Sequence, residues 1–202
     1  MKTVARLRAL FNRSNRNLLS ELIRANFKAV DYNSLLGISW SFIGPAAMLL
    51  MLYLIFNRNF GADIPAYPLY LLIGVVCVNF FVTVTSDMTG ILLNNREIIL
   101  NSTIPEEILL VSNLYVHVHK FVIELAVCLI LSGLCGFFSW STAILLIPLL
   151  ISYAAFVFSI GFMLSLAFCF VRDVQHLWTL ISRLIFFATP VFYSLDAVSP
   201  WA

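Results

Sequence analysis

The sequence contains few charged residues. Only 11% of its 202 residues are charged and 61% are hydrophobic, whereas about a quarter of the residues in an ordinary globular domain are charged. No charged side chain occurs over residues 32–57, 64–86 or 125–171. Because about 20 helical residues cross the hydrocarbon core of a bilayer, each of the first two gaps fits one crossing and the third must hold two. This pattern excludes a soluble protein and predicts an all-α, polytopic membrane protein.

The third gap must fold back on itself, and the natural place for the turn is GFFSWS, residues 136–141. A last apolar run follows, with one arginine and one histidine in it. We therefore predict five spans, over about residues 36–57, 66–88, 112–136, 142–171 and 174–194. They form a transmembrane domain of residues 35–202, and residues 1–34 precede it.

Several catalytic and cofactor motifs are absent. The chain has no G-x-x-x-x-G-K-[ST] phosphate loop, no G-x-S-x-G and no H-E-x-x-H. Its four cysteines lie in apolar spans without C-x-x-C spacing, which predicts buried free thiols rather than a metal site. His117 and His119 point to different faces of a helix. We expect no cofactor in this chain, and any ATP and Mg²⁺ would have to be bound by a separate subunit.

The basic residues predict how the chain is oriented. Seven of the twelve lysines and arginines precede the first span. The positive-inside rule therefore places the N-terminus in the cytoplasm. Arg96, Lys120 and Arg172 then also lie on the inner side. The net charge of +2 reflects this topology and does not indicate nucleic-acid binding. No cleavable signal peptide is apparent, and we expect the first span to act as its own signal.

Residues 1–34 show the periodicity of an amphipathic helix. Apolar and charged residues fall on opposite faces: Leu19, Leu22, Ile23, Phe27 and Val30 on one, Glu21, Arg24 and Lys28 on the other. We predict that this helix lies in the cytoplasmic membrane interface, with Arg24 and Lys28 at the lipid headgroups and Phe27 in the apolar layer. The alternative is a helix that packs only against protein.

The first predicted span carries an aromatic stripe. Phe42, Tyr53, Phe56 and Phe60 are spaced so that they share one helix face. Such a stripe commonly faces lipid or the core. A second interpretation is a wall on which sugar rings stack, because flat rings cover the apolar faces of pyranoses.

Four charged residues fall within predicted spans, where charges are often functional: Asp87 at the end of the second span, Lys120 and Glu124 in the third and Arg183 in the fifth. Lys120 and Glu124 are one turn apart near the cytoplasmic end of the third span, and we expect them to pair. Arg183 lies nearer mid-membrane and should face the bundle interior. It would either contact a phosphate or pair with Asp87 or Glu124.

The stretch Asn94–Glu107 joins the second and third spans on the cytoplasmic side. Its TIPE sequence predicts a helix start, with Thr103 as cap, Pro105 in the first turn and Glu106 completing a capping box. Glu106 and Glu107 suit the positive end of that helix. The segment is either an ordinary interfacial turn or a docking element for a soluble partner.

Four motifs in order carry a family resemblance: SLLGISWSFIGP, STIPEEI, FVRDVQHLW and ATPVFYS. With the leader helix, they make the chain resemble the permease subunits of ABC-type exporters that move O-antigen, capsule or teichoic acid chains on a polyprenyl lipid. The resemblance implies six spans, so a sixth would be expected beyond the final SPWA. It also implies a bacterial cytoplasmic (inner) membrane protein without enzymatic activity of its own.

The same resemblance implies the partners. We expect a homodimer with a channel between the copies, two copies of an ATP-binding subunit and a lipid-linked polysaccharide as substrate. The coupling contacts would be Arg96, Glu97, Ile98, Ile99, Pro105, Glu106 and Glu107. A membrane-embedded enzyme acting on lipid-linked sugars, or a scaffold without transport activity, remain the alternatives.

The predicted topology can be tested by cysteine labelling. Ser14→Cys should stay unlabelled, and Ser139→Cys should react, when intact membranes are treated from the outer face with an impermeant maleimide. Lysis should then expose position 14. Labelling of position 14 before lysis would contradict the orientation.

Overall fold

The computed structural model describes residues 19–26, 43–44, 46–48, 50–51, 54, 67–101, 106–137 and 140–189. The regular structure within these residues is helical and includes no strand, which confirms the predicted all-α class. The main elements are α4 (Tyr67–Asn94), α5 (Arg96–Asn101), α6 (Glu106–Leu134), α7 (Trp140–Phe170) and α8 (Val174–Ala188).

Among the described residues, three helices are long and apolar enough to cross a membrane, namely Tyr67–Asn94, Glu106–Leu134 and Ile144–Phe170. They correspond to the second, third and fourth predicted spans. The helix α8 corresponds to the start of the fifth, and residues 190–194 lie outside the described part of the chain. Most of the first predicted span lies outside it too, together with Phe42, Tyr53, Phe56 and Phe60.

The predicted turn after the third span is confirmed at its first residue. Gly136 has a φ of +80°, a left-handed conformation that residues with a side chain rarely adopt. Its N–H donates to the Gly133 carbonyl over 3.1 Å, and the Phe137 N–H donates to the Ser132 carbonyl over 3.0 Å. This pair of bonds is a Schellman motif, which ends α6 and satisfies carbonyls that would otherwise be left unpaired.

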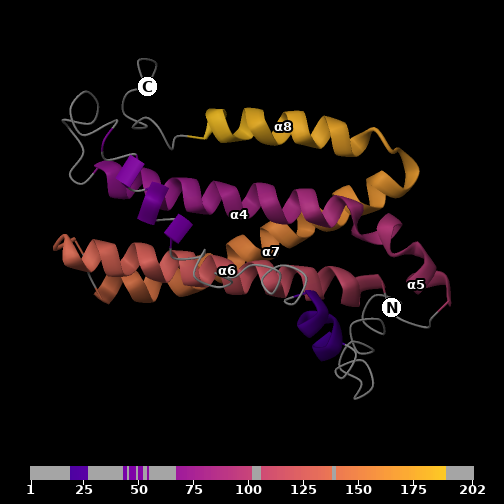
Figure 1. The fold of residues 1–202 in the computed structure, drawn as a ribbon, viewed down its shortest axis with the longest axis horizontal. Coiled ribbons are helices and arrows are strands. Elements are labelled where there is room, and N and C mark those ends of the chain that lie inside the picture. The colour runs from indigo at the N-terminus through magenta and orange to yellow at the C-terminus, as the bar shows by residue number, and fades with distance from the viewer. Residues whose placement is uncertain are drawn as a thin grey trace.

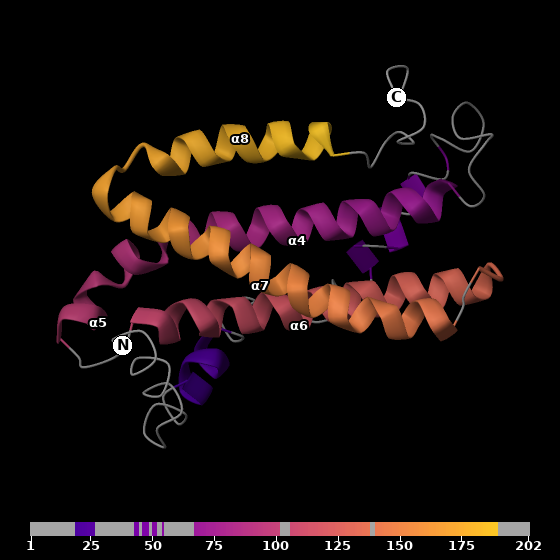
Figure 2. The ribbon, with the colours of Figure 1, turned by 180° about the vertical axis from the view of Figure 1, so that it is seen from behind.

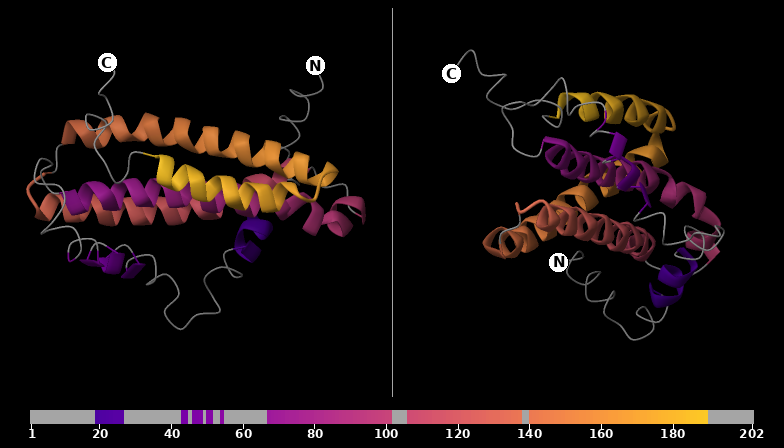
Figure 3. Two further views of the ribbon diagram at one scale, coloured as in Figure 1. Left: turned by 90° about the horizontal axis from the view of Figure 1, so that it is seen from above. Right: turned by 60° about the vertical axis from the view of Figure 1, so that its left-hand side comes forward.

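The helices run roughly lengthwise beside one another, with α4 in the middle (Figures 1 and 2). The helices α6, α7 and α8 all pack against α4, and Figure 3 shows the same bundle from above and from the side. The main core cluster therefore centres on α4 side chains and includes Leu72, Phe80, Val84, Met88, Leu110, Phe121, Cys128 and Val157.

The cysteines only partly follow the prediction of buried thiols. All four are free, and Cys128 is buried and Cys77 partly so. The prediction is wrong for Cys135 and Cys169, which are exposed. Cys169 lies on the outer side of α7, where an apolar sequence indicates contact with lipid as readily as burial in protein.

The helices α4 and α7 approach closely at Gly161. A Cβ atom at this buried position would lie 2.5 Å from Met88 Sδ and 3.1 Å from Met88 Cβ. The side chain of Met88 is fully buried and therefore occupies the space that a larger residue at 161 would need.

The helix α8 is attached to α4 through Trp178. The indole Nε1–H donates to Thr85 Oγ1 over 3.0 Å, and the ring lies 6.0 Å from that of Phe81, centroid to centroid. The buried Thr85 hydroxyl in turn donates to the Phe81 carbonyl over 2.7 Å. The hydroxyl thus accepts and donates at once, which suits a polar group away from water.

Substitution at Gly161 tests the close approach. Gly161→Val should lower the free energy of unfolding in detergent by about 1–3 kcal/mol through overpacking. The exposed Ala155→Val on the same helix should change it by less than about 0.5 kcal/mol. Met88→Ala should relieve part of the Gly161→Val penalty. Equal effects at positions 155 and 161 would contradict the packing.

A double-mutant cycle tests the α4–α8 hydrogen bond. Trp178→Phe and Thr85→Val each remove it, and their coupling energy in detergent unfolding should be about 0.6 kcal/mol, typical of bonds between membrane helices. Trp178→Phe combined with Ser159→Ala on α7 should be additive. A coupling energy of zero between positions 85 and 178 would show that the bond is absent.

Candidate functional site

The segment predicted to lie in the cytoplasm and to couple to a partner forms a short helix and the beginning of a long one. At the end of α4, the Asn95 backbone N–H and side-chain Nδ2 both donate to the Ile91 carbonyl, over 3.1 and 2.9 Å. The chain then continues into the six residues of α5. After residues 102–105, which include Pro105 and lie outside the described part, α6 begins at Glu106.

The predicted contact residues of this segment differ in exposure. Arg96, Glu97 and Glu106 are exposed, and Glu107 is half-buried. Ile99 packs against the chain's own core, while the side chain of Ile98 lies outside the described part. The exposed apolar side chain of α5 is Leu100, at 69% exposure. Sequence analysis missed Leu100 because three apolar residues in a row do not reveal which of them faces the core.

The acidic residues at the start of α6 are placed as expected. Glu106 and Glu107 occupy its first turn. Carboxylates there interact favourably with the positive end of the helix dipole. The surface therefore combines acidic side chains with the cation Arg96 and the apolar Leu100, a mixture suited to a protein partner.

The leader helix lies against the base of α6. Residues 19–26 are helical, and their apolar residues Leu19, Leu22 and Ile23 are half-buried while Glu21 and Arg24 are exposed. Asn26 Nδ2 donates to Ser112 Oγ over 3.2 Å, and the buried Ser112 hydroxyl donates to the Leu109 carbonyl over 2.8 Å. This part of the helix thus contacts protein. Phe27 and Lys28 lie outside the described residues.

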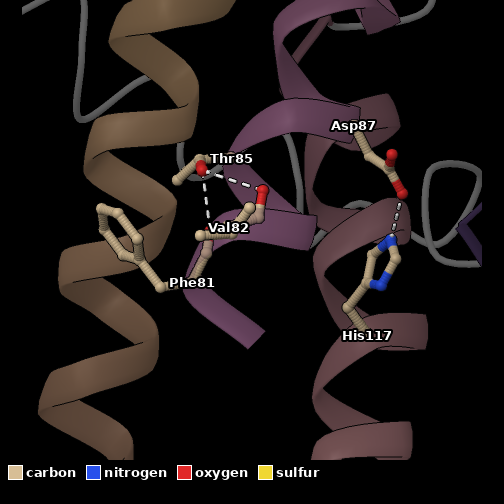
Figure 4. A network of polar contacts seen from close by, with 5 residues as sticks. All are labelled: Phe81, Val82, Thr85, Asp87 and His117. Atoms are coloured by element: carbon tan, nitrogen blue, oxygen red, sulfur yellow. Dashed lines mark hydrogen bonds and ion pairs between the residues drawn. The ribbon is translucent and has the colours of Figure 1, made fainter. Parts of the chain in front are cut away.

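A polar contact inside the bundle joins α4 to α6. His117 Nε2 lies 3.0 Å from Asp87 Oδ2, with the His117 side chain 11% exposed and the Asp87 side chain 52% exposed. Figure 4 shows the pair, with Thr85 directed to the other side of α4. Asp87 therefore uses one carboxylate oxygen to hold α6 and keeps part of its surface open.

The position of Arg183 differs from the prediction. It is exposed on α8 and forms no ion pair with Asp87 or Glu124. The side of α8 that faces α4 carries Trp178, Ser182 and Ile185, spaced by four and three residues. Arg183 follows Ser182 by one residue and so points about 100° away from that side. Asp87 is paired with His117 instead.

Lys120 and Glu124 also differ from the prediction. Lys120 is exposed and Glu124 half-buried, and no ion pair joins them in the part of the chain that the structure describes. A lysine that precedes a glutamate by four residues is the less favourable order of an i,i+4 pair on a helix. The two residues share a face of α6 without direct contact.

Aromatic side chains gather in the core of the bundle. The rings of Phe80 and Phe121 stack at a centroid distance of 4.3 Å, and Tyr153 lies 5.8 Å from Phe80. The Tyr153 hydroxyl donates to the Cys77 carbonyl over 2.9 Å. These aromatics hold α4, α6 and α7 together and are distinct from the predicted stripe on the first span.

Three known proteins that are similar to the chain are named as export permeases. The chain is 27% identical over 185 residues to the O-antigen export system permease protein RfbA of Myxococcus xanthus, covering 91% of this chain and 70% of that protein. Two proteins of the same name from Klebsiella pneumoniae are each 25% identical over 185 residues, covering 90% of this chain and 71% of theirs. No family model matches the chain. The similarity covers about nine tenths of the chain.

Proposed function

We propose that the chain is the membrane-spanning permease subunit of an ABC transporter that exports a lipid-linked polysaccharide of the O-antigen type across the bacterial cytoplasmic membrane. The observation that carries this proposal is the similarity to three O-antigen export permeases over about nine tenths of the chain. The three long apolar helices agree with a permease. Among the glycans considered above, the names of these relatives favour O-antigen over capsule or teichoic acid.

The energy for export comes from a separate subunit in this proposal. The chain has no phosphate-binding loop, so two copies of an ATP-binding partner hold ATP and Mg²⁺. Two copies of the permease pair to form the channel. The leader helix lies along the cytoplasmic surface, where Arg24, Phe27 and Lys28 interact with lipid.

The partner docks on α5 and the start of α6. Arg96, Glu97 and Glu106 are exposed there, and Leu100 adds apolar surface. Glu107, Ile98, Ile99 and Pro105 complete the proposed contact. Movement of this segment reaches α4 through the contact between His117 and Asp87, and reaches the leader helix through Ser112 and Asn26.

Two further roles complete the mechanism. Phe42, Tyr53, Phe56 and Phe60 line the glycan path with rings on which sugars stack. Arg183, exposed on α8, receives a phosphate of the lipid carrier. Its guanidinium suits that role because it presents several donors and remains charged.

Charge reversal tests the docking surface and the function together. Glu106→Lys with Glu107→Lys should weaken association with the ATPase about tenfold and lower export in proportion, because like charges then face the partner and the positive helix end. Membrane insertion should be unchanged. Co-purification and the amount of surface polysaccharide in cells lacking their own permease provide the measurements.

The control is Asp173→Lys in the other described cytoplasmic turn, whose side chain makes no capping hydrogen bond. It should leave association and export near the wild-type level. A Glu106 and Glu107 double variant that binds its ATPase and exports normally would rule out this docking surface.

The two alternative functions have outcomes of their own. Modification of lipid-linked sugars by the purified chain without ATP would indicate an enzyme, and the absence of both export and sugar modification would indicate a scaffold.

A further inference from the structure

The exposed residues of the C-terminal half of α4 are polar. The exposed residues of this helix are Tyr70, Asn79, Thr83, Asp87 and Asn94. The outer side of α7 is different, with large apolar side chains such as Leu145, Leu149, Phe156, Met163 and Phe170 exposed. Its exposed Ser152 and Ser159 donate hydrogen bonds to carbonyls of their own helix. The exposed side of α7 is therefore suited to contact with lipid, and the exposed side of α4 is not.

The polar residues of α4 form one stripe. Asn79, Thr83 and Asp87 follow one another at intervals of four, which places them on one face, and Asn94 continues it seven residues later. From Asn79 to Asn94 the stripe extends about 22 Å along the helix. The opposite side carries buried residues, among them Thr85 and Met88. Figure 4 shows Thr85 and Asp87 directed to different sides of α4.

The stripe has unused hydrogen-bonding capacity. The buried Thr85 and Thr89 donate to carbonyls of their own helix over 2.7 Å. Asn79 and Thr83 make no side-chain hydrogen bond within the described residues. Polar groups at membrane depth that lack partners in their own chain normally face a protein neighbour or a water-filled space. Lipid is therefore an unsuitable neighbour for this face.

The hydrogen-bonding groups of the stripe indicate which class of ligand it could bind. Amides and a hydroxyl both donate and accept, and a carboxylate accepts. This set matches the hydroxyl groups of a sugar chain. The carboxylate of Asp87 disfavours an anionic ligand such as a phosphate, and the polar groups disfavour an acyl chain.

We infer that Asn79, Thr83, Asp87 and Asn94 form a track on α4 that hydrogen-bonds the sugar hydroxyls of the glycan during export. This inference rests on the proposed function and adds to it a polar side of the path, separate from the aromatic stripe on the first span. Several hydrogen bonds of moderate strength suit a glycan that must bind to the transporter and then be released as it is exported.

Cysteine accessibility tests whether the stripe faces water. In a chain whose four native cysteines are replaced by alanine, Asn79→Cys and Thr83→Cys should react with a water-soluble maleimide in the assembled transporter. Ser152→Cys and Ser159→Cys on α7 should not react, because the reactive thiolate does not form in lipid. Lack of reaction at positions 79 and 83 would overturn the inference. So would a disulfide between the Thr83→Cys residues of two copies, which would assign this face to a contact between copies.

Export measurements test binding of the glycan. Asn79→Leu and Thr83→Val should each reduce export roughly fivefold, the effect of losing one hydrogen bond, while protein amount and ATPase co-purification stay unchanged. Ser152→Ala on α7 is the matched control and should export normally. Normal export by both α4 variants would overturn the track but leave the proposed function intact. Absence of export by the wild-type chain with its ATPase would overturn the proposed function and the track together, even if the stripe were labelled.

Discussion

A helix in lipid must find partners for its polar groups within the protein, and α4 supplies one such partner to each helix packed against it. His117 of α6 contacts Asp87, Tyr153 of α7 donates to the Cys77 carbonyl, and Trp178 of α8 donates to Thr85 Oγ1. Each contact is modest, since hydrogen bonds between membrane helices contribute about 0.6 kcal/mol on average. These contacts fix how the helices are oriented relative to α4, because packing of apolar side chains alone would permit the helices to rotate and slide.

The three contacts also divide α4 into sides with different neighbours. Thr85 and Asp87 are two residues apart and hold helices on different sides. The close approach at Gly161 brings in α7 from a third direction, against Met88. Asp87 shares its side of α4 with Asn79 and Thr83, which remain exposed beside the contact with His117. The helix α4 is therefore mostly buried but keeps a stripe of exposed polar residues.

The sequence alone predicts where the helices lie along the chain better than it predicts which helices pack against one another. Gaps without charge locate α4, α6 and α7, since charge is costly in lipid wherever it points. The glycine of GFFSWS marks the end of α6 because a left-handed turn needs it. The direction in which a side chain points is harder to predict, because it depends on which helix packs next to it. Arg183 was expected to face the interior, but Trp178 and Ser182 occupy the inner side of α8.

The same limit applies to the candidate site. Counting spans in the sequence predicts that Asn94–Glu107 lies on the cytoplasmic side, and the short helix found there agrees with the polar ends and apolar middle of this segment. Which of its apolar residues is exposed depends on how α5 folds back on the core, so that Leu100 rather than Ile99 is open. The pairing of His117 with Asp87 was equally hidden, because the two residues lie on different helices.

The distribution of contacts along α6 suggests why this helix suits a coupling role in the proposed exporter. Ser112 and His117 lie about 9 and 16 Å beyond Glu106 along the helix axis, and they connect α6 to the leader helix and to α4. Beyond them the contacts are mainly aromatic and apolar, through Phe121 and Cys128. Directional contacts are therefore concentrated near the end of α6 that begins at Glu106, and contacts that tolerate small shifts lie farther along the helix. A displacement at Glu106 would then move the leader helix and the inner part of α4 together, while the outer part of the bundle adjusts by sliding.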